Sequence, residues 1–185
     1  MSVETGEIIG KHDPNSVISG RRDIGAAHYP LLGPYDSNDE QVILTYLKWA
    51  REVGIDGFIV SWWGVNSFSD KSLRRVLDVA DESKLGIKIT VYYESVGLTK
   101  KPIEEVVKDF ECIIKSYGGR PSFLKLKGKP VIFVYAVSVK EPKFWRDVFS
   151  TLRSRGLKCV FIGDTFDERC AIYFEGIHTY NPWEQ

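Results

Sequence analysis

Aromatic and polar side chains gather where short apolar runs of this sequence end. One such run leads into the pair Trp62-Trp63, and another leads into Tyr92 and Glu94. An indole ring beside hydroxyl and carboxyl groups suits a sugar, because the C–H faces of a pyranose stack on the ring while its hydroxyls hydrogen-bond to the polar groups. These residue types therefore indicate a carbohydrate site, provided that the fold brings them together.

Apolar runs alternate with amphipathic helices from about residue 40 onward. The predicted strands are 57–62, 87–93, 130–136, 158–163 and 176–180. The first predicted helix lies in DSNDEQVILTYLKWAREVG, where Ser37 or Asp39 can cap it and Gly54 ends it. The others cover about 71–83, 102–117 and 142–154, and a short helix or turn follows near 165–171. This alternation predicts βα units and a parallel sheet. No GXGXXG or GXXXXGKS/T motif opens a helix, which disfavours a nucleotide-binding doubly wound sheet.

The expected fold class is therefore α/β, a parallel (β/α)8 TIM-barrel type of which about five strands are visible. We expect a single domain over residues 1–185, in which 1–22 is a loop-rich lead-in. In such barrels the C-terminal ends of the strands face the active site. In chain order those ends are Ser61-Trp62-Trp63, Tyr92-Tyr93-Glu94, Tyr135, Asp164 and His178 to Asn181.

Strand alternation gives these side chains a direction. It points Trp63, Tyr92 and Glu94 into the barrel, and it points Trp62 toward the helices or over the rim. His28 belongs to the segment AHYPLLGPY, a loop that could fold over the mouth. The candidate substrate-binding residues are Trp62, Trp63, Tyr92, Glu94, His28, Tyr29, Asp164, Tyr180 and Asn181.

Five of these assignments have a structural alternative. The tryptophans could both be packing residues. Glu94 could pair with a loop lysine such as Lys100, and Asp164 could cap the turn that follows its strand. His28 could be a hydrogen-bonded structural histidine.

The balanced charge of the chain gives no indication of a polyanionic partner. The chain has 25 basic and 25 acidic residues, so neither nucleic acid nor an anionic membrane is an expected partner. The three histidines and three cysteines show no metal-ligand spacing, so no cofactor is expected. No stretch suits a transmembrane span or a signal peptide, and a cytoplasmic location is expected for the chain as given.

Several segments resemble one known family. HYPLLGPYDSND, followed after a helix by GIDGFIVSWWG, is similar to the start of the glycoside hydrolase family 99 domain, the endo-α-1,2-mannosidase type. Weaker similarity continues in order through KITVYYES, GKPVIFVYAV and GIHTYNPW, so that the resemblance covers about residues 23–183. It implies a (β/α)8 barrel that cleaves an α-mannoside internally with retention, so an α-mannosyl oligosaccharide is the implied partner. The five visible strands would be the second to sixth of that barrel, so the first and last units are expected to be missing.

The family's catalytic segment is the main departure. In the family, an E-W-x-E segment supplies a general acid/base and a second Glu that assists the sugar's own 2-hydroxyl, which differs from direct carboxylate attack. No E-W-x-E segment occurs here, and Glu184 is the C-terminal candidate without a second Glu after it. We therefore expect part of the sugar-binding surface without the catalytic pair, and an isolated chain with little or no activity.

Two other functions stay open. A non-catalytic carbohydrate-binding or scaffold protein could have kept the aromatic platform, and a sugar-transfer enzyme could use a similar barrel. In each case a partial barrel would leave its two outer strands unpaired on one side, which favours self-association.

Overall fold

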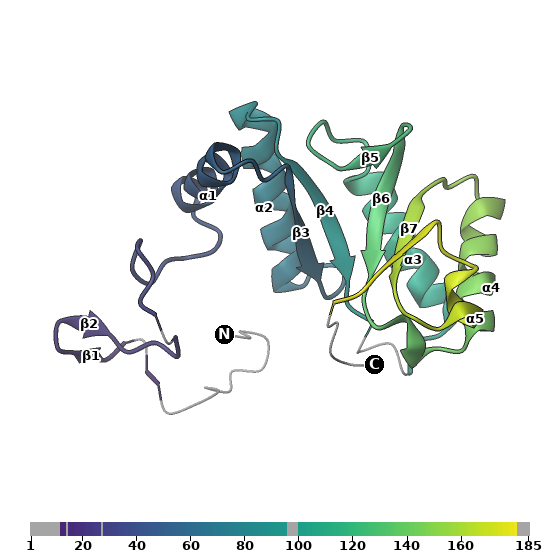
Figure 1. Ribbon diagram of the computed structural model, residues 1–185, viewed down its shortest axis with the longest axis horizontal. Coiled ribbons are helices and arrows are strands. Elements are labelled where there is room, and N and C mark those ends of the chain that lie inside the picture. Colours follow the sequence, from purple (N-terminus) through teal and green to yellow (C-terminus); the bar gives the residue numbers. More distant parts are fainter. Residues whose placement is uncertain (1–11, 14, 27, 96–99, 181–185) are drawn as a thin grey trace.

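The computed structural model describes residues 12–13, 15–26, 28–95 and 100–180, and these residues form one main parallel sheet (Figure 1). Its strands are β3 (Gly57–Trp62), β4 (Lys88–Tyr93), β6 (Lys129–Val134), β7 (Val160–Asp164) and β8 (Gly176–His178). They pair in this order, and all four of these pairings are parallel. The sequential parallel order predicted from the alternation of strands and helices is therefore confirmed.

Helices lead into or connect the strands. They are α1 (Glu40–Glu52), α2 (Phe68–Ser83), α3 (Ile103–Ser116), α4 (Pro142–Ser154) and the short α5 (Glu168–Ala171). A 3₁₀ turn, η2 (Val137–Val139), lies between β6 and α4. Helix α2 starts three residues before the predicted position because the Ser67 hydroxyl accepts the Asp70 N–H and so caps an earlier turn. None of the described helices is long and apolar enough to cross a membrane.

The main core lies between these helices and one face of the sheet (Figure 1). Its large side chains stack in a continuous series of aromatic pairs. Tyr93 lies 5.8 Å from Trp62 and 4.6 Å from Phe110, measured between ring centroids. Phe149 of α4 stacks on Phe161 of β7 at 4.3 Å. These contacts fix the helices against the strands and hold the strand ends in place.

The parallel register lines up residues on the other face of the sheet. Ser61 lies opposite Tyr92, and Tyr92 lies opposite Phe133. Two residues further toward the C-terminal ends, and so on the same face, Asp164 lies opposite His178. Since residues in register on neighbouring parallel strands project to the same face, the strand-end side chains come together at one edge.

Two small hairpins lie outside the predicted elements. Strand β1 (Val17–Ile18) pairs antiparallel with β2 (Arg21–Arg22), and β5 (Lys125–Leu126) pairs antiparallel with β6. Each connection has two residues in the left-handed region, the second of them a glycine: Gly20 has φ +77° and Gly128 has φ +77°. Two-residue strands carry too little periodicity to be predicted, although both turns are of a kind that favours hairpins. Residues 1–22, expected as a loop-rich lead-in, therefore include the first of these hairpins.

Candidate functional site

Tyr92 of β4 is the centre of an aromatic cluster at the C-terminal ends of the strands. Its ring centroid lies 5.5 Å from Tyr135, 5.4 Å from His178 and 6.1 Å from Tyr180. Phe133 extends the cluster by an edge contact with His178 at 5.3 Å. The cluster joins residues that follow or end three different strands, so the fold gathers these rings as the strand-end pattern predicts.

Glu94 lies beside this cluster, directly after β4. Its carboxylate accepts a hydrogen bond from the Ser61 hydroxyl of the neighbouring strand β3, and no ion pair joins it to Lys100 among the described residues. Burial raises the pKa of Glu94 above its ordinary value, while the Ser61 hydrogen bond works in the opposite direction. Glu94 can therefore accept a hydrogen bond when ionised and donate one when protonated.

Asp164 joins the ends of three strands. Its Oδ2 accepts the N–H of Ala136 at 3.2 Å, and its Oδ1 accepts the N–H of Tyr180 at 3.0 Å. Helix α5 is capped instead by Asp167, whose side chain accepts the N–H of Arg169. Asp164 therefore does not cap the turn that follows its strand, because its carboxylate accepts backbone N–H groups that follow β6 and β8.

Two buried polar atoms of the cluster have no hydrogen-bond partner among the described residues. They are the Tyr92 hydroxyl and Nε2 of His178. Burial, followed by the negative charges of Asp164 and Glu94, raises the pKa of Tyr92, so its hydroxyl stays protonated at neutral pH. Buried polar groups normally have partners, so these atoms mark where a ligand could supply one.

The adjacent tryptophans take different positions. Trp63 is 52% exposed and directly follows β3. Trp62 is 0% exposed, stacks on Tyr93, and donates its Nε1–H to Asp70 at 2.9 Å. Trp62 therefore lies toward the helices, and its complete burial does not fit the direct substrate contact expected of it.

His28 and Tyr29 do not join the cluster. The Tyr29 hydroxyl accepts the N–H of Arg22 in β2 at 3.2 Å, and the Arg21 guanidinium lies 5.2 Å from the Tyr29 ring centroid. Tyr29 is thus held by the β1–β2 hairpin, which stands apart from the strand ends in Figure 1. His28 is exposed. The expected closure of this loop over the mouth is not seen, because its contacts are local.

The remaining candidate residues and their neighbours differ in what the structure describes. Asn181 lies outside the described residues. The sequence places Ser61, Tyr135 and His178 at strand ends without marking them as binding residues, whereas the structure puts Ser61 against Glu94 and the other two against Tyr92. The pairing register is the signal that links them, since it places Ser61 beside Tyr92 and His178 beside Asp164.

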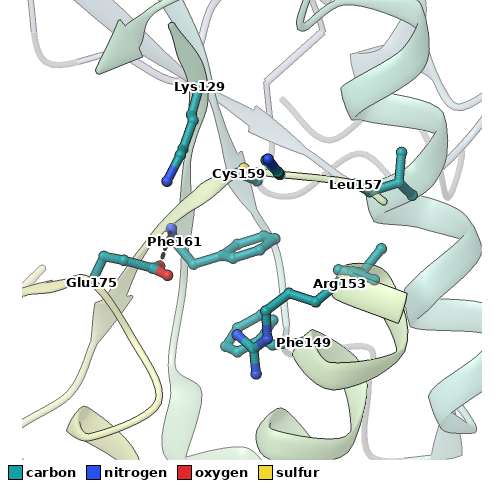
Figure 2. Close-up of a pocket in the computed structure, with 9 residues that line it drawn as sticks. Lys129, Phe149, Arg153, Leu157, Cys159, Phe161 and Glu175 are labelled. Atoms are coloured by element: carbon teal, nitrogen blue, oxygen red, sulfur yellow. Dashed lines mark hydrogen bonds between the residues drawn. The ribbon is translucent and has the colours of Figure 1, made fainter. Parts of the chain in front are cut away.

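A separate hollow of about 100 Å³ lies at the opposite ends of the strands (Figure 2). Its lining includes Phe149 and Phe161, and Glu175 accepts the Phe161 N–H at 2.9 Å. Cys159 also lines it, and burial raises the pKa of this thiol, which keeps it protonated and unreactive. The N-terminal ends of barrel strands usually serve stability.

Among the described residues, no group of three or more His, Cys, Asp or Glu is arranged to hold a metal.

Comparison with known proteins agrees with this geometry. The family model described as glycosyl hydrolase family 99 matches residues 3–181. The chain belongs to glycosyl hydrolase family 99. A mouse relative, glycoprotein endo-alpha-1,2-mannosidase, is 28% identical over 193 aligned positions that cover 93% of this chain and 41% of the relative. The human glycoprotein endo-alpha-1,2-mannosidase-like protein is 26% identical, with 92% of this chain and 40% of the relative covered.

Solved family 99 structures share the fold. The GH99 endo-alpha-mannosidase from Bacteroides thetaiotaomicron superposes with a TM-score of 0.74 and 27% identity, covering 92% of this chain and 54% of that one. Its complex with BIS-TRIS-propane gives a TM-score of 0.70 and 27% identity over 83% of this chain and 50% of that one. The α/β barrel-type fold predicted from the sequence is therefore confirmed, and the family 99 chain spans about half or less of the proteins that it matches.

Proposed function

We propose that the C-terminal edge of this sheet binds a glycan with α-mannosyl units, as part of an endo-acting, retaining α-mannosidase barrel. The observation that carries the proposal is the Tyr92 cluster, in which rings, carboxylates and unpartnered polar atoms meet at one edge. Family membership supports the substrate class, since the relatives are named endo-alpha-1,2-mannosidases.

The C-terminal ends of β3 and β4 offer each kind of contact that a pyranose needs. The half-exposed indole of Trp63 provides a flat apolar face, and the Tyr92 hydroxyl provides a protonated donor. Glu94, oriented by Ser61, provides an acceptor for a sugar hydroxyl. Flat aromatic faces next to oriented polar groups give both affinity and orientation for a sugar ring.

Hydrolysis belongs to the complete barrel in this proposal. The 185 residues contain no E-W-x-E segment, so they supply binding groups without the family's pair of glutamates. We therefore expect the isolated chain to bind an α-mannoside without cleaving it.

Isothermal titration calorimetry with α-mannobiose tests the binding role. The Trp63→Ala variant should bind about tenfold more weakly than the wild type, because it loses the stacking face. Trp49→Ala is the matched control, since Trp49 lies in α1 and packs on Tyr46 away from the strand ends. Equal affinities for the wild type and Trp63→Ala would remove the stacking role. A wild type without any α-mannobiose binding would favour the scaffold alternative.

A further inference from the structure

The short connection between β3 and α2 carries Trp63 in a constrained backbone. Gly64 has φ +128° and Asn66 has φ +63°, both in the left-handed half of conformational space. The Ser67 N–H also donates to the Gly64 carbonyl at 3.3 Å, which closes the turn. Because Trp63 is half exposed, core packing alone does not fix it, and its position depends on what holds this backbone.

Asp70, in the first turn of α2, is the buried acceptor at the centre of this region. It is 2% exposed. Its Oδ1 accepts the Trp62 indole N–H at 2.9 Å and the Tyr117 hydroxyl at 2.7 Å, while its Oδ2 accepts the backbone N–H of Asn66 at 3.0 Å. One carboxylate thereby joins the end of β3, the connection that follows it and the C-terminal cap of α3.

A serine pair completes the contact with Trp63 itself. The Trp63 backbone N–H donates to the Ser69 hydroxyl oxygen at 2.9 Å. Ser69 in turn lies 2.8 Å from the Ser67 hydroxyl, which caps the Asp70 N–H. The residues on both sides of Trp63, and its own amide, are therefore tied to the start of α2.

We infer that Asp70 and Ser69 are positioning residues that hold Trp63 at the mouth of the site. The inference rests on the proposed role of Trp63 in glycan binding. It explains why the two tryptophans are adjacent. The buried Trp62 fixes the end of β3 through its hydrogen bond to Asp70, and the next residue, Trp63, is thereby held with its indole exposed. A ligand platform needs this kind of support from neighbouring hydrogen bonds, because small displacements of a binding group reduce affinity.

The charge state of Asp70 is consistent with this role. Burial acts to raise its pKa, but the hydrogen bonds from Trp62 and Tyr117, followed by the Asn66 amide and Arg74, lower the pKa below its ordinary value. Asp70 is therefore ionised at neutral pH, and hydrogen bonds to an ionised acceptor are stronger than neutral ones.

Amide hydrogen exchange followed by NMR tests the positioning directly. An Asp70→Asn side chain has one acceptor oxygen in place of two, so it cannot accept from both Asn66 and the Trp62–Tyr117 pair. We expect the Asn66 and Trp63 amides to exchange about tenfold faster in Asp70→Asn, and the Trp63 amide to do so in Ser69→Ala. Unchanged exchange at Trp63 in both variants would overturn the inference.

Asp81→Asn is the matched control. Asp81 lies in the same helix α2, and its carboxylate also accepts a backbone amide, that of Ser122 at 2.7 Å, together with the Arg120 guanidinium. This variant should leave exchange at Trp63 within about twofold of the wild type, since the lost bonds lie elsewhere. An equal acceleration in Asp81→Asn would mean that α2 merely loses stability, which would count against a specific clamp. If Asp70→Asn fails to fold, Ser69→Ala decides the question by the same measurement.

A double-mutant cycle with α-mannobiose then links the clamp to binding. When Trp63 is present, Asp70→Asn or Ser69→Ala should weaken α-mannobiose binding several-fold. The loss should not exceed that caused by Trp63→Ala. In the Trp63→Ala background the same changes should have no further effect, because they act through Trp63. Additive losses would overturn the positioning role. If the wild type does not bind α-mannobiose, the proposed function fails, whereas the exchange measurements still decide whether Asp70 and Ser69 hold Trp63.

Discussion

At the scale of single residues, removal of the Tyr92 hydroxyl should affect ligand binding without lowering the stability of the fold. It is buried and has no partner among the described residues, so its desolvation is not compensated within them. Tyr92→Phe should therefore leave the free energy of unfolding unchanged or raise it by about 1 kcal/mol. The same change should weaken α-mannobiose binding, because a sugar hydroxyl loses its donor.

Chemical denaturation and calorimetry on the same Tyr92→Phe sample check both parts. Tyr93→Phe is the control, since the Tyr93 hydroxyl donates to Asp109 at 2.7 Å on the helix side of the sheet. That variant should lose stability and keep its affinity. A large loss of stability in Tyr92→Phe would show that its hydroxyl has a structural role.

The raised pKa of Glu94 predicts that the free energy of unfolding falls as the pH rises. Its pKa is raised in the folded protein above the ordinary value of 4.5, mainly by burial. The folded state therefore holds this proton longer than the unfolded state does, and the resulting stability is lost as pH rises from 4.5 through the folded pKa. Compared with Glu94→Gln, the wild type should lose free energy of unfolding across that window.

Urea denaturation at a series of pH values measures this difference. Ser61→Ala should enlarge it, because the Ser61 hydrogen bond opposes the rise in the pKa of Glu94. A difference between wild type and Glu94→Gln that does not change with pH would contradict the raised pKa.

At the scale of elements, alternation along the chain predicted more of the site than residue type did. It predicted that Trp62 and Trp63 point to opposite sides, and the burial of Trp62 beside the exposure of Trp63 agrees with this. It could not predict that Asp70 would bind the Trp62 indole, since that contact depends on where α2 starts. Nor could it place Tyr29, whose partners come from a hairpin too short to show a periodic pattern.

The adjacent glycines after α3 make a matched pair of tests of element packing. A Cβ on Gly118 would lie 2.6 Å from the Ile114 carbonyl oxygen and 2.6 Å from Cγ of Pro130 at the start of β6. A Cβ on Gly119 would meet nothing within 4 Å. We expect Gly118→Ala to lower the free energy of unfolding by about 1–3 kcal/mol, because the end of α3 must move away from β6.

Gly119→Ala should change the free energy of unfolding by less than about 1 kcal/mol. Thermal and urea denaturation of the two variants compare them directly. Equal stabilities would show that the end of α3 adjusts freely, and that its close approach to β6 does not restrict the sequence there.

At the scale of the whole molecule, the sheet order that was predicted leaves β3 and β8 each paired on one side among the described strands. The sequential parallel order could be predicted because each βα unit is local in sequence. The positions of the two outer strands, β3 and β8, relative to each other could not be predicted, since they depend on segments far apart in the chain. Apolar side chains lie on both: Ile59 of β3 is 49% exposed and Ile177 of β8 is 54% exposed.

Edge strands with free backbone groups and exposed apolar side chains favour pairing with another chain. We therefore expect this chain to self-associate at micromolar concentration, as seen by size-exclusion chromatography with light scattering. Ile59→Lys should shift the population toward monomer, because a charge on an edge strand opposes pairing. Val53→Lys is the control, since Val53 is 73% exposed just after α1 and lies outside the sheet. A monodisperse wild-type monomer would contradict the expectation, and an equal effect of both lysine variants would show that the association does not use the β3 edge.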